Sequence, residues 1–107
     1  MNSGQSFLGE FEVVDDENVV VLLSEQVWKH IVERRGEDFI KWWNEIKDTI
    51  QNPDFKCRSK NKPTTKVYVK KNNSKRNFPS KYLLVFVSED NVIKTSYFSK
   101  TLKGLIT

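Results

Sequence analysis

His30 is the residue of this chain best suited to proton transfer near neutral pH. It is the only histidine, and histidine is the side-chain type that changes charge in that range. Arg34 follows one helical turn later, with Arg35 next to it. A histidine beside two guanidinium groups could transfer a proton while the arginines hold a phosphate. A plainer interpretation also fits, in which His30 lies on the surface and the arginines complement the negative end of a helix dipole.

A second group of candidate residues lies in a predicted strand over residues 92–99. Its hydroxyl-bearing residues include Thr95, Ser96 and Tyr97. Hydroxyl groups on a strand can hold a phosphate oxygen, and a tyrosine ring can also stack on a base. Alternation along the strand predicts one face with Lys94, Ser96 and Phe98, and the other with Ile93, Thr95 and Tyr97. Threonine is common in strands, so a structural role fits as well.

The charge of the chain is divided near residue 54. Residues 1–54 contain 12 of the 14 acids and 5 of the 18 bases, a net charge of −7, whereas residues 55–107 contain 2 acids and 13 bases, a net charge of +11. Such a basic region attracts a polyanion, because each neutralised phosphate releases counterions. A solvated, solubilising surface is the alternative interpretation.

Aromatic residues are interleaved with these bases, which favours nucleic acid as the partner. In the predicted strand 66–70, one face carries Lys66, Tyr68 and Lys70, so stacking and phosphate contacts could come from one surface. The nucleic-acid-binding residues expected from this pattern are Lys66, Tyr68, Lys70, Lys71, Lys75, Arg76 and Lys94. The expected partner is RNA, either transfer RNA or a single strand.

The sequence offers little support for other chemistry. One histidine and one cysteine, Cys57, cannot form a metal site rich in these residues or an internal disulfide. There is no glycine-rich phosphate loop. The chain also lacks an apolar run of the roughly 20 residues that span a membrane, and its start lacks the pattern of a signal peptide. We therefore expect a cytoplasmic protein with no metal, no cofactor and no membrane partner.

A hairpin and a capped helix are predicted at the start of the chain. Two short β-prone runs at residues 11–14 and 19–23 flank a polar loop. Ser24 can cap the helix that follows, and Gly36 can end it. The apolar stripe of that helix consists of Val27, Trp28, Ile31 and Val32.

A second helix is predicted over residues 37–51, followed by strands at 66–70, 82–87 and 92–99. The core face of this helix should carry Phe39, Trp43, Ile46 and Ile50, with Trp42 at its edge. The order of elements predicts a single α+β domain over residues 1–107, in which the hairpin and two helices pack on an antiparallel sheet.

Several segments together resemble a known family. Residues 28–37 (WKHIVERRGE) are similar to a helix end in which His-Ile is followed by Arg-His-Pro-Glu. Residues 46–54 (IKDTIQNPD) are similar to a second helix that closes in Asn-Pro-Asp. Residues 82–87 and 92–98 resemble the last hairpin of the same family. This is the phage-type branch of the barnase–EndoU–colicin–RelE-like (BECR) ribonucleases, small metal-independent enzymes often used as toxins or effectors.

The resemblance implies this fold for roughly residues 24–100, and metal-independent RNA cleavage. His30 would act in acid–base catalysis, and Thr95 or Ser96 would lie with Tyr97 beside the scissile phosphate. The 2′-hydroxyl would attack that phosphorus, leaving a 2′,3′-cyclic phosphate and a 5′-hydroxyl. A toxin of this kind would also imply an acidic neutralising protein as a partner.

The chain departs from the family pattern at two positions. Arg35 stands where the family has its second histidine, and Gly36 where it has proline. A guanidinium can stabilise negative charge but can hardly exchange protons near neutral pH. A second acid–base group would have to be Tyr97, a lysine or a carboxylate, or else the activity has been lost. The alternative function is then a non-catalytic RNA-binding module of the same fold.

Overall fold

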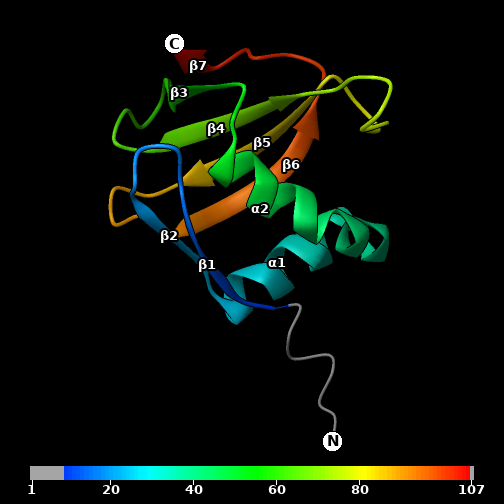
Figure 1. Cartoon of the computed structure of the whole chain (residues 1–107), viewed down its shortest axis with the longest axis horizontal. Coiled ribbons are helices and arrows are strands. Elements are labelled where there is room, and N and C mark those ends of the chain that lie inside the picture. Colours follow the sequence, from blue (N-terminus) through cyan, green and yellow to red (C-terminus); the bar gives the residue numbers. More distant parts are fainter. Residues whose placement is uncertain (1–8, 107) are drawn as a thin grey trace, which may run out of the picture.

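The computed structural model describes residues 9–106 and confirms an α+β architecture with an antiparallel sheet. The elements are β1 (Phe11–Val14), β2 (Val20–Leu23), α1 (Glu25–Arg35), the 3₁₀ helix η2 (Glu37–Trp42), α2 (Trp43–Gln51), β3 (Phe55–Ser59), β4 (Lys66–Lys71), β5 (Tyr82–Val87), β6 (Ile93–Ser99) and β7 (Leu105–Ile106). The five-stranded sheet has the order β6-β5-β4-β3-β7, and β1 and β2 form a separate hairpin. In Figure 1, α2 packs against the middle of the sheet and α1 lies beside the edge strand β6.

The predicted hairpin and first helix are both present. The strands β1 and β2 pair antiparallel, with Val14 opposite Val20. The N–H of Val27 donates to Ser24 Oγ at 3.1 Å, so Ser24 caps α1. Gly36 ends the helix with φ 98°, and its N–H donates to Val32 O. Glycine suits this position because other residues rarely adopt such a φ.

The prediction of one α-helix over residues 37–51 is wrong in its first half, where the chain forms η2 instead. A 3₁₀ helix has three residues per turn, so residues three apart lie on the same side. This winding brings Phe39 and Trp42 to one side, where their ring centroids lie 5.6 and 5.2 Å from that of Phe98. The aromatic contacts explain the tighter winding, and Trp42 lies at the edge of the core as predicted.

Two strands of the sheet, β3 and β7, were not predicted from the sequence. β3 pairs with β4 on one side and with β7 on the other. Lys56 and Arg58 interrupt the apolar pattern of β3, which hides it among the basic residues. Its core contribution is Cys57, which is buried. β7 has only two residues, too few for a periodic signal.

The sheet separates two apolar clusters. The larger one, the helix-side core, contains Trp28 and Ile31 of α1, Phe39 of η2, and Ile46 and Ile50 of α2. It also contains inward-facing sheet residues, among them Tyr68, Leu83, Val85, Val87 and Ile93. The smaller one, the outer cluster, is built from Cys57, Val67, Val69 and Leu84 with partly buried neighbours such as Phe86 and Tyr97. The central strand β5 therefore has apolar contacts on both faces, as its sequence predicts.

A β-bulge in β6 changes the predicted alternation of that strand. Phe86 pairs with Thr95 but Val87 pairs with Ile93, so Lys94 is an extra residue between them. The bulge returns Ile93 to the helix-side core. The expectation that Ile93 shares a face with Thr95 is therefore wrong.

Within residues 9–106, no helix is long and apolar enough to cross a membrane.

Candidate nucleic-acid interface

The structure does not bring His30 together with the hydroxyl groups of β6. The His30 side chain is 72% exposed, and its Nδ1 lies 3.9 Å from Glu33 Oε1 on the same helix. Thr95 pairs with Phe86 of the outer cluster, so its side chain is on the sheet face opposite α1. Arg34 is exposed at the end of α1. A single phosphate shared by His30 and Thr95 is not supported by this arrangement.

Arg35 is the predicted site residue that does reach β6. Its Nε donates to the main-chain oxygen of Ser96 at 3.3 Å, and its guanidinium carbon lies 4.8 Å from the ring centroid of Tyr97. Since β6 is an edge strand, its outward carbonyls need partners from elsewhere. Arg35 therefore reaches around the sheet edge and stacks on the opposite face. The Ser96 hydroxyl is buried and donates to Leu84 O at 2.7 Å, so it cannot hold a phosphate.

The predicted binding face of β4 is wrong for two of its three residues. Tyr68 is 0% exposed and Lys70 is 5% exposed, because β4 lies inside the sheet and beneath α2. Tyr68 Oη donates to Asp15 Oδ2 at 2.6 Å. Lys70 Nζ donates to Asn52 O and lies 3.3 Å from Asp48 Oδ2. Neither side chain can stack on a base or contact a phosphate.

The remaining predicted basic residues lie at two ends of the sheet. Lys66 begins β4 opposite Val87, and Lys94 is the bulged residue at the start of β6, so both are at one end. Lys71 is at the other end of β4, where the loop 72–80 begins, and this loop carries Lys75 and Arg76. Lys71, Lys75 and Arg76 therefore form the part of the predicted set that lies together.

A basic pocket of about 550 Å³ lies at this second end of the sheet. Lys71 pairs with Tyr82, and Tyr82 pairs with Ser99, so the adjoining residues Lys81 and Lys100 come together there. The pocket, which we call the lysine pocket, is lined by Lys71, Lys81, Lys100, Pro79, Ser80 and Tyr82, among others. Lys81 and Lys100 are not among the nucleic-acid-binding residues expected from the sequence. The predicted pairing of strand 82–87 with strand 92–99 could have placed them side by side.

The three lysines of this pocket differ from several other bases of the chain. Lys56, Lys70 and Arg76 each lie within 4.0 Å of a carboxylate oxygen. Among residues 9–106, none of Lys71, Lys81 and Lys100 has a carboxylate within that distance. Their positive charge is therefore available to an anion from solution.

The loop 72–80 that borders the pocket is held by its own asparagines. Asn72 Oδ1 accepts from the N–H of Phe78 at 2.7 Å. Asn73 Oδ1 accepts from the N–H groups of Lys75 and Arg76, both at 2.9 Å. Side-chain to main-chain bonds of this kind order a turn before any ligand arrives. The backbone that carries Lys75 and Arg76 is therefore held in place by bonds within the loop.

Two further pockets adjoin the loop. One, of about 320 Å³, is lined by Arg35, Asp38, Trp42, Pro79 and Tyr97, among others. The other, of about 370 Å³, lies between α2 and the loop and is lined by residues including Trp42, Glu45, Asp48, Lys75, Arg76 and Phe78. Burial raises the pKa of Glu45, and the nearby Asp48 raises it further. Pro79, Trp42 and Phe78 each line two of the three pockets, so the pockets surround one segment.

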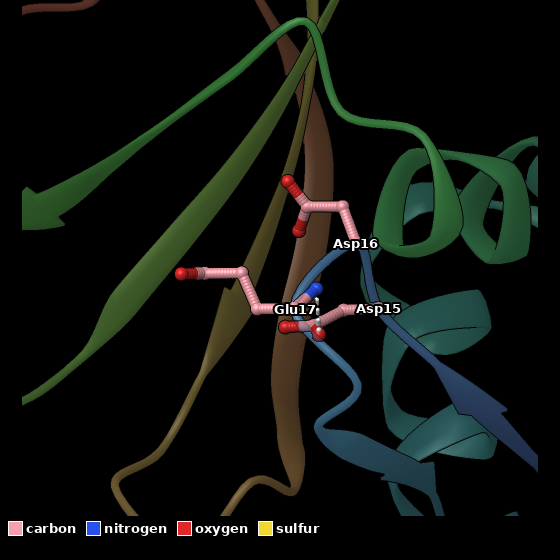
Figure 2. A group of neighbouring side chains, drawn as sticks. All are labelled: Asp15, Asp16 and Glu17. Carbon is pink, nitrogen blue, oxygen red and sulfur yellow. Dashed lines mark hydrogen bonds between the residues drawn. The ribbon is translucent and has the colours of Figure 1, made fainter.

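Figure 2 shows an acidic cluster in the hairpin loop, formed by Asp15, Asp16 and Glu17. Asp15 Oδ1 accepts from the N–H groups of Glu17 and Val19, at 2.8 and 2.9 Å. Lys56 Nζ of β3 lies 2.8 Å from Asp16 Oδ1 and also contacts Glu17. The bonds of Asp15 hold the loop itself, and the contacts with Lys56 attach the hairpin to the sheet. These structural roles are sufficient reason for the acids to gather there.

Comparison with known proteins gives no further assignment, since no family model, curated protein or solved structure matches this chain.

Proposed function

We propose that this protein binds RNA at the end of the sheet where β4 and β6 end and β5 begins. The observation that carries the proposal is the lysine pocket, which is lined by three lysines that have no carboxylate within 4.0 Å among residues 9–106. Gathering like charges without counter-charges is unfavourable unless an anion offsets it. The adjoining pockets contain the cations Lys75 and Arg35 together with the acids Asp38, Glu45 and Asp48, so the lysine pocket is the one of the three whose lining has no carboxylate.

The test is a titration of a fluorescent single-stranded RNA at several salt concentrations. The substituted protein carries Lys71→Ala, Lys81→Ala and Lys100→Ala. We expect its dissociation constant to rise, and the slope of log affinity against log salt to shrink by about 2, since each contact with a single strand contributes about 0.7. The matched control carries Lys60→Ala, Lys62→Ala and Lys94→Ala, which removes the same charge from exposed positions elsewhere. Absence of binding by the unmodified protein, or an equal loss in both variants, would overturn the proposal.

A metal-independent ribonuclease is the second candidate, and the stacking of Arg35 on Tyr97 favours it. These residues line a pocket that shares Pro79 with the lysine pocket. In the reaction the 2′-hydroxyl would give its proton to water as its oxygen bonds to phosphorus, and the 5′-oxygen would take a proton from water as its bond to phosphorus breaks. Arg35 would stabilise the added negative charge. We expect RNA cleavage in EDTA that Arg35→Ala abolishes and His30→Ala leaves in place, because His30 points to Glu33. RNA recovered intact would exclude this candidate and leave binding as the function.

The BECR fold remains part of the proposal. Its support is the order of a helical pair followed by an antiparallel sheet. The connection between the helices argues for a local difference from the family pattern. Gly36 has φ 98° where that pattern has proline, whose φ is held near −65°. An experimental structure superimposed on a BECR ribonuclease would test the relationship directly.

A further inference from the structure

We infer that the lysine pocket binds the terminal phosphate of an RNA strand, a phosphate monoester, rather than an internal phosphodiester; this rests on the proposed RNA binding. An internal diester carries one negative charge, whereas a terminal monoester carries nearly two at neutral pH. Three lysines line the pocket, and none has a carboxylate within 4.0 Å among residues 9–106, which favours the ligand with the larger charge.

The geometry of the strand ends brings these cations around one volume. Lys71 is the last residue of β4, Lys81 immediately precedes β5, and Lys100 immediately follows β6. These three strands are neighbours in the sheet. The three lysines therefore come from three chain segments and line one pocket, and each ammonium group offers three donors to the oxygens of a phosphate.

Asp54, which contacts the main chain of Lys71, is already engaged. Asp54 Oδ2 accepts from the N–H of Lys71 at 2.7 Å and lies 3.4 Å from an Arg76 nitrogen. The neighbouring carboxylate is thus held by one main-chain donor and one guanidinium. The ammonium group of Lys71 lies more than 4.0 Å from any carboxylate of residues 9–106.

The rest of the pocket suits the nucleoside that carries the phosphate. Tyr82 is half-buried and Pro79 is exposed, and both line the same volume of about 550 Å³. A tyrosine ring can stack on a base of any identity. The pocket would accordingly read the phosphorylated end of a strand without selecting its terminal base.

The experiment compares one single-stranded RNA sequence in three forms, with a 5′-phosphate, with a 3′-phosphate, and with neither. At pH 7.5 we expect one phosphorylated form to bind about tenfold more tightly than the unphosphorylated form, as an added charge-assisted contact would produce. Inorganic phosphate, added as a competitor, should reduce that preference. If it binds with the same affinity as the phosphorylated end, the ligand is free phosphate and the inference fails.

Two controls separate this inference from RNA binding itself. The preference should weaken at pH 5, because the second phosphate pKa is about 6 and the monoester then carries about one negative charge instead of nearly two. It should be lost in the Lys81→Ala, Lys100→Ala variant and retained in Lys60→Ala, Lys62→Ala. Equal binding of all three RNA forms would overturn the inference and leave the proposed function standing. Binding of none would overturn both.

Discussion

At the scale of single residues, the bond between Asp15 and Tyr68 joins the hairpin to the sheet. Both side chains are buried, and the phenol donates to the carboxylate at 2.6 Å. Burial alone would raise the pKa of Asp15, but the bonds from Tyr68, Val19 and Glu17, together with Lys56, lower it below its usual value. Burial and the same bond raise the pKa of Tyr68 far above its usual value, so it remains a donor. The pair is most favourable when Asp15 is charged.

We predict that Asp15→Asn lowers the free energy of unfolding at pH 7 by about 2 kcal/mol, the scale of a hydrogen bond to a charged group. A lowered pKa in the folded state means that this stability is present above the unfolded value near 3.8 and is lost as the pH falls through the folded value. The difference between the two proteins should therefore narrow below about pH 4. Urea denaturation at a series of pH values measures it.

Glu45 gives the matched control, because its pKa is shifted in the opposite direction. A raised carboxyl pKa favours the folded state at low pH, and this contribution is lost as the pH rises through the folded value. Glu45→Gln should stabilise the protein at pH 7 by about 0.5 kcal/mol, a small value because the side chain is partly exposed. If the free energy of unfolding depended on pH in the same way in both variants, the opposite pKa shifts of Asp15 and Glu45 would be contradicted.

At the scale of elements, the junction between α1 and η2 determines where Arg35 lies. Gly36 has φ 98° and ψ 159°, a region that only glycine enters readily. The chain reverses there, so that η2 returns Phe39 to contact Trp28 with ring centroids 6.4 Å apart. Arg35, the last residue of α1, is thereby directed at the edge of β6.

We predict that Gly36→Ala destabilises the protein by about 1–3 kcal/mol through backbone strain. No atom lies within 4 Å of the added methyl group, so a steric clash would not explain the loss. Thermal denaturation measures the effect, and Glu37→Ala at the next, exposed position is the control. An unchanged melting temperature would show that this junction readily takes another conformation.

At the scale of the whole molecule, the two oppositely charged parts of the chain fold onto each other. The acidic part supplies the hairpin and helices, and the basic part supplies the sheet. Ion pairs cross between them at Lys56 with Asp16, Lys70 with Asp48, and Arg76 with Asp54. Within residues 9–106, the three lysines of the lysine pocket have no such pair, and they give that end of the sheet its positive charge.

We predict that amide hydrogen exchange is slowest in β4 and β5 and fastest, among the sheet strands, in β7. β4 and β5 are paired on both sides and contain mostly buried residues, whereas β7 pairs over two residues at an edge. Exchange followed by mass spectrometry should show this order.

Asp15→Asn should accelerate exchange in β1 and β2 more than in β5. Uniform acceleration would mean that the hairpin and sheet open together.

The sequence by itself determined most elements and most of the core. Apolar spacing identified the Trp28 and Ile31 face of α1 and the doubly covered β5, because periodicity depends only on neighbours along the chain. Ser24 and Gly36 marked the helix ends for the same local reason. The basic composition of residues 55–107 likewise required no structure to be recognised.

The tertiary structure alone decided which of these residues can act together. Spacing put Tyr68 and Lys70 on one face of a strand, but only the packing of the helices and hairpin made that face the buried one. It also left His30 exposed and carried Arg35 to Tyr97. Lys81 and Lys100 are 19 positions apart in the chain and meet through strand register. Periodicity specifies which side chains share a face, whereas strand order, register and layer packing depend on contacts between distant residues.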